Sequence, residues 1–323
     1  MSIPAQRAVI STELDDRTEA ETTASVRGVP TQVQRTLRVL RRGTYDPTYR
    51  VEYGPDDGPV NAVWRTALTP EGPGTLRARV GRNSAAVEAD DEVELAAWGE
   101  GAQWLLKQAP AMLGAEDDLT GFAELAAAHP ILAEAHRTRP QVRLISTGLM
   151  LQALIPAILE QKVTTLSAYA AWRRLVRAHG TPAPGPAWMP SDMYVMPEPR
   201  AWTLIPSWEW RRAEVDGKRA ETIIRACQRA AAIERLADAG VAEAAAKLQT
   251  IPGIGPWTAA ETLQRSHGAP DLVSVGDLHL PRIICGILGE PGDPTYDDAK
   301  MLELLAPFAP HRQRAVRILL QKR

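Results

Sequence analysis

The sequence is poor in cysteine, and this shortage limits the cofactors that it can hold. Among 323 residues only Cys227 and Cys285 occur, far apart and inside apolar helical patterns. Four thiolates for an iron–sulfur cluster are therefore not available. We expect both thiols to be reduced core residues, and the sequence predicts no cofactor.

The amino terminus also has no long apolar run. It is too polar for a signal peptide or a membrane span. We therefore expect a soluble, cytoplasmic protein with no membrane partner. No heptad pattern is present either, which makes a monomer the expected state.

Neither sign of charge is in clear excess over the whole chain, which has a net charge of −2, but the two parts of the chain differ. Residues 1–118 contain 13 basic and 19 acidic side chains, a net charge of −6. Residues 119–323 contain 24 basic and 20 acidic side chains, a net charge of +4. Only the second part would attract phosphate, and its modest charge makes binding depend on where individual basic side chains lie.

The composition changes along the chain in a way that indicates separate domains. Residues 1–35 are polar and charged without sustained periodicity, so we expect a flexible tail. From Thr36 to about Glu94, turn-prone stretches separate short segments with strand character: TLRVL, YRVEY, AVWRTAL, TLRARVG and SAAVEA. This pattern predicts an antiparallel sheet of four or five strands. An amphipathic helix from Glu94 to Leu113 would cover one face of the sheet and complete an α+β domain over residues 36–118.

From Leu119 onward the periodicity is helical almost throughout. Gly148 to Gln161 is apolar and is expected to form a central buried helix. A long stretch from Gly180 to Pro206, rich in Pro, Trp and Met, is expected to be packed. The predicted fold class is therefore α+β, with a small antiparallel sheet domain followed by an all-helical domain over residues 119–323.

A glycine hairpin, Pro252-Gly253-Ile254-Gly255-Pro256, lies between two of these helical patterns. The glycines allow positive φ and a close approach to a partner, and Pro256 suits the first turn of the next helix. Amides of the turn and of that first helical turn lack intrahelical acceptors, so the hairpin suits a phosphate. An ordinary helix connection with a glycine cap explains the same residues equally well.

A single carboxylate, Asp277, follows Trp257 by 20 residues and opens another helical pattern. From the local sequence alone, a helix N-cap is its favoured role.

The hairpin and this carboxylate carry a family resemblance. The run L-Q-T-I-P-G-I-G-P-W-T-A, followed by V-S-V-G-D-L-H-L-P-R-I, resembles the hairpin and catalytic-aspartate segment of the helix-hairpin-helix DNA glycosylase superfamily, closest to the bacterial 3-methyladenine DNA glycosylase II branch. The resemblance extends to R-P-Q-V-R-L and A-I-L-E-Q-K-V upstream and covers roughly Leu119 to Arg323. It implies a base excision repair enzyme that binds double-stranded DNA containing damaged bases and rotates the target base out of the duplex.

The resemblance also implies the chemistry. Asp277 would be the catalytic residue, because a fixed carboxylate stabilises the positive charge that develops on the sugar when the N-glycosidic bond breaks. An N-cap role is compatible with this one. Bifunctional relatives have a lysine where this chain has Trp257, and an indole cannot form a Schiff base. A monofunctional glycosylase that leaves an abasic site without a strand break is therefore expected.

DNA contacts follow from the same resemblance. The residues expected to bind the phosphate with the hairpin are Gly253, Ile254, Gly255, Trp257 and Thr258. The carbonyls expected to hold a monovalent cation, Na⁺ or K⁺, belong to Gln249, Ile251 and Ile254. Leu144 would be the wedge that fills the base stack, with a core leucine at the start of a helix as the alternative. Further residues expected to face DNA are Gln161, Lys162, His279 and Arg282, for which packed or solvated side chains are the alternatives.

The base pocket is expected to contain aromatic side chains, because an electron-rich ring can stack on a cationic alkylated purine. The predicted pocket residues are Trp257, Trp202, Trp208 and His311. His311 occupies a position where the branch offers an aromatic residue. Because a histidine can donate a hydrogen bond to a neutral or oxidised base, the sequence leaves open a lesion spectrum that differs from that of the branch. Alternatives to alkylated purines are oxidised or deaminated bases, and a helix-hairpin-helix protein that binds DNA without catalysis is the alternative to an enzyme.

Overall fold

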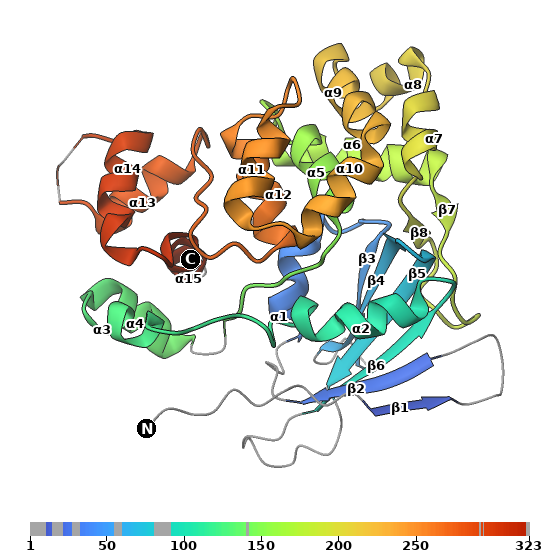
Figure 1. Cartoon of the computed structure of the whole chain (residues 1–323), viewed down its shortest axis with the longest axis horizontal. Coiled ribbons are helices and arrows are strands. Elements are labelled where there is room, and N and C mark those ends of the chain that lie inside the picture. Colours follow the sequence, from blue (N-terminus) through green and yellow to red (C-terminus); the bar gives the residue numbers. More distant parts are fainter. Residues whose placement is uncertain are drawn as a thin grey trace.

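The structure is a computed structural model and describes residues 11–14, 22–27, 33–54, 60–80, 92–139, 142–290, 292 and 294–320. Its amino-terminal part is a six-stranded antiparallel sheet in the order β1-β2-β6-β5-β4-β3 (Figure 1). The strands are β1 (Ser11–Leu14), β2 (Thr22–Arg27), β3 (Tyr49–Tyr53), β4 (Val60–Thr69), β5 (Gly72–Val80) and β6 (Glu92–Trp98). This sheet followed by a mostly helical part confirms the predicted α+β fold class.

One helix, α2 (Ala102–Met112), packs on the sheet. Its residues Leu105 and Leu106 are buried in one cluster with Leu76, Val93 and Leu95 of the strands. Along β6 the buried positions recur at nearly every second residue, which is the period of a strand with one apolar face, whereas the central part of β4 is buried on both faces. This packing gives the amino-terminal part a hydrophobic core of its own.

Three details of the predicted amino-terminal part are wrong. Residues 1–35 include β1 and β2 and are not only a flexible tail. Along β2 the side chains alternate between buried and less buried, but the small Ser, Thr and Ala residues concealed this period in the sequence. TLRVL forms helix α1 (Val33–Leu37) and a 3₁₀ turn, η1 (Arg38–Leu40). The expected helix from Glu94 begins only at Ala102, because EVELAAW alternates and pairs with β5 and β2. The expected strand SAAVEA lies outside the described residues.

The second part of the chain is mostly helical. Its helices are α3 (Phe122–Ala127), α4 (Pro130–Thr138), α5 (Met150–Leu159), α6 (Thr165–His179), α7 (Pro199–Leu204), α8 (Ser207–Arg212), α9 (Gly217–Gln228), α10 (Ala230–Glu234), η3 (Arg235–Asp238), α11 (Val241–Gln249), α12 (Pro256–Ser266), α13 (Leu280–Leu288), α14 (Asp298–Leu305), η4 (Ala306–Phe308) and α15 (Arg312–Leu320). The predicted central helix is α5, in which every residue except Gln152 is buried. Among the described residues, no helix has the length and apolar composition needed to cross a membrane.

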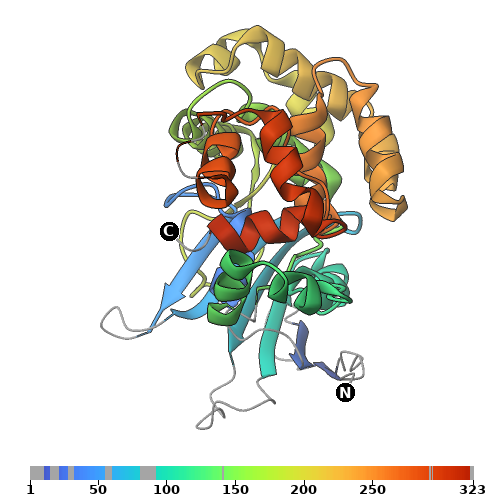
Figure 2. The same ribbon diagram turned by 90° about the vertical axis from the view of Figure 1, so that its left-hand side faces the viewer.

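Two hydrophobic clusters organise these helices. The first surrounds α5 and includes residues of α6, α9, α11 and α12. The second joins α3 and α4 to α13, α14 and α15, and Figure 2 shows the red carboxy-terminal helices above the green pair formed by α3 and α4. Helix α12 belongs to the first cluster, whereas the chain that follows it leads into the second.

The stretch from Gly180 to Pro206 is packed, as predicted, partly against the sheet and partly in the cluster around α5. It contains a short ribbon of β7 (Thr181–Pro182) and β8 (Tyr194–Val195), so the second part is not all-helical. Met193 is buried with Trp64 and Trp98 of the sheet. The Trp- and Met-rich loop thus ties the two parts of the chain together.

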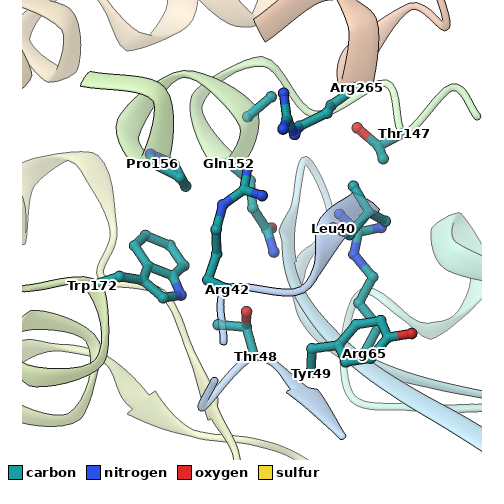
Figure 3. A pocket seen from close by; sticks show the side chains of 11 residues that line it. Leu40, Arg42, Thr48, Tyr49, Arg65, Thr147, Gln152, Pro156, Trp172 and Arg265 are labelled. Atoms are coloured by element: carbon teal, nitrogen blue, oxygen red, sulfur yellow. The ribbon is translucent and has the colours of Figure 1, made fainter. Parts of the chain in front are cut away.

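A small polar cavity lies at the junction of the two parts (Figure 3). Beside it, the buried Asp46 carboxylate accepts hydrogen bonds from the Arg42 amide at 2.6 Å and from the Trp172 indole of α6 at 3.1 Å. Arg65 lines the cavity, and burial lowers the pKa of its guanidinium to about 10. The contact with Trp172 fixes the segment before β3 to α6.

Candidate active site

The predicted hairpin connects α11 to α12. The Ile254 amide donates to the Ile251 carbonyl at 3.0 Å, which closes the turn, and Gly253 has a φ of +97°. The amides of Gly253, Gly255 and Trp257 have no hydrogen-bond acceptor among the described residues. They lie at the amino-terminal end of an 11-residue helix, where backbone donors and the helix dipole favour an anion.

The carbonyls predicted to hold a cation lie on the other side of this turn. Those of Gln249 and Ile254 have no hydrogen-bond donor among the described residues, whereas the Ile251 carbonyl accepts the Ile254 amide. Two unpaired carbonyl oxygens at a tight turn suit a hard cation, for which oxygen is the preferred ligand. Within the described part of the chain, no cluster of three His, Cys, Asp or Glu side chains could form a metal site.

Gly253 is the hairpin position least tolerant of a side chain. A Cβ atom there would lie 2.1 Å from Oγ1 of Thr222 on α9, in addition to the strain of positive φ. We predict that Gly253→Ala costs about 1–3 kcal/mol of unfolding free energy and weakens DNA binding, because the turn must move. Urea denaturation and a DNA-binding titration measure the two effects.

The matched control is Gly217→Ala. Gly217 is the first residue of α9, and a Cβ atom there would meet nothing within 4 Å. This substitution should leave stability unchanged or raise it. Equal tolerance of both substitutions would contradict the strained geometry of Gly253.

Gln161, which follows α5, forms hydrogen bonds with the hairpin and with the first turn of α12. Its side-chain amide donates to the Gly253 carbonyl at 2.9 Å and to Oγ1 of Thr258 at 2.8 Å. The residue was predicted to face DNA, and the structure instead directs its amide nitrogen at the protein's own turn. The neighbouring Lys162 is exposed, with a φ of +55°.

Asp277 lies just before α13 and is held by three donors. Oδ1 accepts the backbone amides of His279 at 2.8 Å and Leu280 at 2.9 Å, and Oδ2 accepts the indole N–H of Trp257 at 2.9 Å. The first two contacts have the pattern of a helix N-cap, in which the side chain accepts the amides two and three residues further on, although His279 is the residue directly before α13. The third joins the carboxylate to the first turn of α12.

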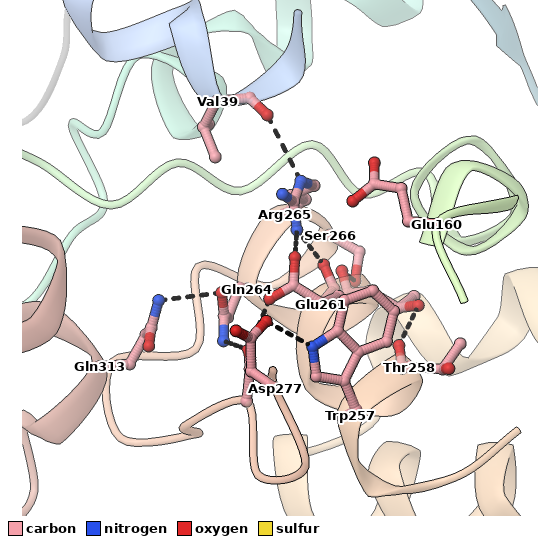
Figure 4. A network of polar contacts seen from close by, with 12 residues as sticks. Val39, Glu160, Trp257, Thr258, Glu261, Gln264, Arg265, Ser266, Asp277 and Gln313 are labelled. Carbon is pink, nitrogen blue, oxygen red and sulfur yellow. Dashed lines mark hydrogen bonds and ion pairs between the residues drawn. The ribbon is translucent and has the colours of Figure 1, made fainter. Parts of the chain in front are cut away.

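The segment before Asp277 is fixed by polar contacts that sequence reasoning missed (Figure 4). Gln264 of α12 donates to the Leu272 carbonyl at 2.9 Å and to Oγ of Ser274 at 2.8 Å. Ser274 in turn donates to Glu261 at 2.5 Å. Glu261 and Gln264 follow Trp257 at helical spacing, which is the signal in the sequence that could have indicated a shared face.

Other residues predicted to face DNA are exposed around this site. His279 and Arg282 are exposed at the start of α13. Leu278, which the sequence reasoning did not consider, directly follows Asp277 and is 86% exposed. Its apolar side chain is therefore open to solvent next to the carboxylate.

The predicted wedge, Leu144, is not available in this way. It is 8% exposed, in the extended segment before α5, and its amide donates to Asp117 at 2.9 Å. The alternative reading, a core leucine before a helix, describes its surroundings. Two preceding residues, 140 and 141, lie outside the described part of the chain.

Three of the predicted pocket residues, Trp202, Trp208 and His311, make no hydrogen bond to Asp277 in the described structure. Trp202 is fully buried, with its ring stacked near Trp172 and Trp210, because a large apolar side chain fills the core of α6 to α8. Trp208 is exposed on α8. His311 is buried, with Nε2 3.1 Å from the Thr120 carbonyl and its ring against Phe122. Of the predicted aromatic residues, only Trp257 contacts Asp277.

A helical hairpin with free amides lies on an α+β scaffold, and a fixed carboxylate follows Trp257 by 20 residues; this arrangement resembles the fold of helix-hairpin-helix DNA glycosylases. Comparisons with known proteins agree. A DNA-3-methyladenine glycosylase of Bacillus subtilis (strain 168) is 27% identical over 197 residues, which are 60% of this chain and 63% of the relative, less than two thirds of its length. No protein-family model matches the sequence.

Solved structures extend the similarity to the amino-terminal part. A 3-methyladenine DNA-glycosylase from Archaeoglobus fulgidus has a TM-score of 0.71 at 16% identity, covering 92% of this chain and 97% of that chain. An 8-oxoguanine glycosylase/lyase of Clostridium acetobutylicum, in complex with dsDNA containing cytosine opposite 8-oxoG, has a TM-score of 0.66 at 10% identity, covering 97% and 98%. The chain thus has the fold of helix-hairpin-helix DNA glycosylases, which confirms the resemblance found in the sequence.

Proposed function

We propose that this protein is a monofunctional DNA glycosylase that hydrolyses the N-glycosidic bond of alkylated purines in double-stranded DNA. The observation that carries this proposal is the position of Asp277, whose carboxylate is held by two backbone amides and by the indole of Trp257. All three contacts come from donors, so they complement a negatively charged carboxylate. The same helix that supplies the indole begins with the free amides of the hairpin.

The mechanism follows from the charge that the reaction creates. Breaking the N-glycosidic bond moves an electron pair to the base and leaves positive charge on the sugar. A preorganised carboxylate stabilises that charge without having to reorient, and it can orient water for attack on the sugar carbon. Because Trp257 has no amine, no Schiff base forms at this position and the strand remains intact.

Alkylated purines are the proposed substrates for two reasons. They already carry positive charge, so the base can leave without being protonated by the enzyme, and the partly buried ring of Trp257 offers a surface for stacking. Two of the similar proteins described above are named as 3-methyladenine glycosylases.

Excision of an oxidised base is the second candidate. One similar structure is an 8-oxoguanine glycosylase/lyase, and polar groups of Gln264 and Ser274 lie beside the Asp277 segment, where they could pair with a neutral base. In the described structure, however, these groups bind each other.

A panel of duplexes with a single lesion tests the proposal: 7-methylguanine, 3-methyladenine, 8-oxoguanine, uracil and an undamaged control. We expect release of the methylated purines by the purified protein at rates well above that for 8-oxoguanine. Faster release of 8-oxoguanine would favour the second candidate. Binding to every duplex without release of any base would favour a non-catalytic DNA-binding protein.

The remaining features of the proposal concern binding. The hairpin amides would hold a backbone phosphate, with a monovalent cation at the carbonyls of Gln249, Ile251 and Ile254 adding attraction. Lys162, His279 and Arg282 would face the duplex. We propose that one copy of the chain acts alone, in the cytoplasm.

A further inference from the structure

Helix α12 connects the two functional parts of the proposed site. Its residues Trp257, Glu261 and Gln264 are separated by four and three positions and therefore share one face. Their partners run in the opposite direction: Trp257 contacts Asp277, Glu261 contacts Ser274, and Gln264 contacts both Ser274 and the Leu272 carbonyl. The helix and the segment that carries the carboxylate are therefore held in one register.

Two further contacts support this register. The Gly276 amide, directly before the carboxylate, donates to Asp298 at the start of α14 at 2.9 Å. Arg265 forms an ion pair of 2.7 Å with Glu261, whose side chain is 15% exposed. The first contact fixes the segment before Asp277 to the start of α14, and the second fixes the orientation of the Glu261 side chain.

At its amino-terminal end, the same helix is held by Gln161. The amide of this residue reaches from the turn after α5 to the Gly253 carbonyl and the Thr258 hydroxyl. Thr258 directly follows Trp257, so these contacts lie at the same first turn as the indole, whereas Gln264 and Ser274 hold the Asp277 segment further along the helix. The hairpin and the Asp277 segment thus have separate supports.

We propose that two separate sets of contacts position the proposed site: Gln161 positions the hairpin that would bind the phosphate, and Gln264 and Ser274 position the segment that leads to Asp277. This inference rests on the proposed function. The two sets meet α12 at different places, since Gln161 contacts Thr258 in its first turn and Gln264 lies about 9 Å further along the helix axis. Damage to one support should therefore affect one step of the reaction.

Glu261 belongs to the supports and is not a second catalytic carboxylate. One of its oxygens accepts the Ser274 hydroxyl at 2.5 Å, and the other faces the Arg265 guanidinium at 2.7 Å. Unlike Asp277, which is held by two amides and an indole, Glu261 is 15% exposed and its charge is compensated by the ion pair with Arg265. The geometry assigns it the role of a positioning residue.

The first arm of the test removes the carboxylate supports with Gln264→Met and Ser274→Ala. We expect base release from a methylated duplex at saturating enzyme to slow about 10–100-fold, since small misplacements of a catalytic group have effects of this size. The Kd for a duplex with a stable abasic-site analogue should stay within about twofold. Ser274→Thr keeps a hydroxyl and should restore most of the rate.

The second arm removes the hairpin support with Gln161→Met, a substitution of similar size without the donor. Two hydrogen bonds are lost, so we expect the Kd for the same analogue to rise about tenfold. The rate of base release at saturating enzyme should change less than about threefold. This variant would then lose affinity and nearly keep its rate, whereas the variants of the first arm lose rate and keep their affinity.

Matched controls remove similar contacts elsewhere. Gln108→Met on α2 removes a donor to the Ser146 carbonyl at 3.2 Å, and Ser266→Ala removes a hydroxyl from α12 that donates to Thr262 and not to the catalytic segment. Both should keep wild-type Kd and rate. Melting temperatures of all variants show whether a change reflects loss of the fold.

The outcomes separate the two levels of the argument. If both arms lower affinity and rate in the same proportion, or if the controls do so equally, the inference of two separate supports is wrong while the proposed function stands. A wild-type protein that releases no base from any duplex overturns the proposed function and with it the catalytic arm. In that case the Kd of Gln161→Met alone supports or overturns the hairpin arm.

Discussion

Asp277→Asn should lower the rate of base release about a thousandfold, because removal of one preorganised group that stabilises transition-state charge has effects of this order. Asparagine keeps the shape of the side chain and remains a good N-cap, so the backbone contacts to His279 and Leu280 can persist. What disappears is the negative charge facing the sugar. Single-turnover release of methylated purine from a saturated complex measures the effect directly.

Asp297→Asn is the matched control for the capping role. Asp297 caps α14 by accepting the Lys300 amide at 2.8 Å, in an exposed position. This variant should show wild-type base release and little change in stability. If Asp277→Asn also released base at the wild-type rate, Asp277 would be a cap only, and the catalytic assignment would fall.

Asp117→Asn should cause the largest loss of stability. Asp117 and Arg314 form a two-pronged ion pair at 2.5 and 2.6 Å, with side chains 4% and 1% exposed. Removing one charge leaves the other buried without compensation, which costs about 3–5 kcal/mol. Because Asp117 also accepts the Leu144 amide, the segment before α5 should loosen as well. Urea denaturation measures the loss.

An exposed ion pair provides the comparison. Glu134 and Arg137 pair on the surface of α4, with side chains 48% and 74% exposed. Glu134→Gln should change the unfolding free energy by less than about 1 kcal/mol. Losses of equal size at the two sites would show that the burial of the Asp117 pair carries no special cost.

Local patterns explain what the sequence predicted well. The hairpin and the residues after it form one continuous stretch, in which glycine, proline and helical spacing act at short range. The central helix α5 is recognisable because nearly all of its residues are apolar. The antiparallel sheet could be predicted because turn-prone stretches bound its longest strands, β4 and β5, which are rich in residues typical of strands.

Long-range packing explains what the sequence could not predict. Trp202, Trp208 and His311 are aromatic residues of suitable type, but only the fold decides that the first fills a core, the second lies on the surface of α8, and the third packs against Phe122. Leu144 resembles a wedge by position, and its burial follows from contacts with distant residues. The strands of the amino-terminal tail depend on β6, which lies about 70 positions later.

The supports of the site fall between these two cases. Gln161 lies 92 positions before the carbonyl that it binds, so no local pattern reveals the contact. Glu261 and Gln264 share a helical face with Trp257, which the sequence does show. Their partner segment, however, could be placed only by the structure.

The measurement that tests the central claim most directly is an analysis of the products formed from a duplex with one methylated purine. Mass spectrometry and a denaturing gel, run before and after alkali, identify the released base and the state of the strand. Hydrolysis at Asp277 predicts free methylated base and an intact strand with an abasic site that breaks only in alkali. A strand cleaved before alkali, or a lesion strand of unchanged mass, would contradict it.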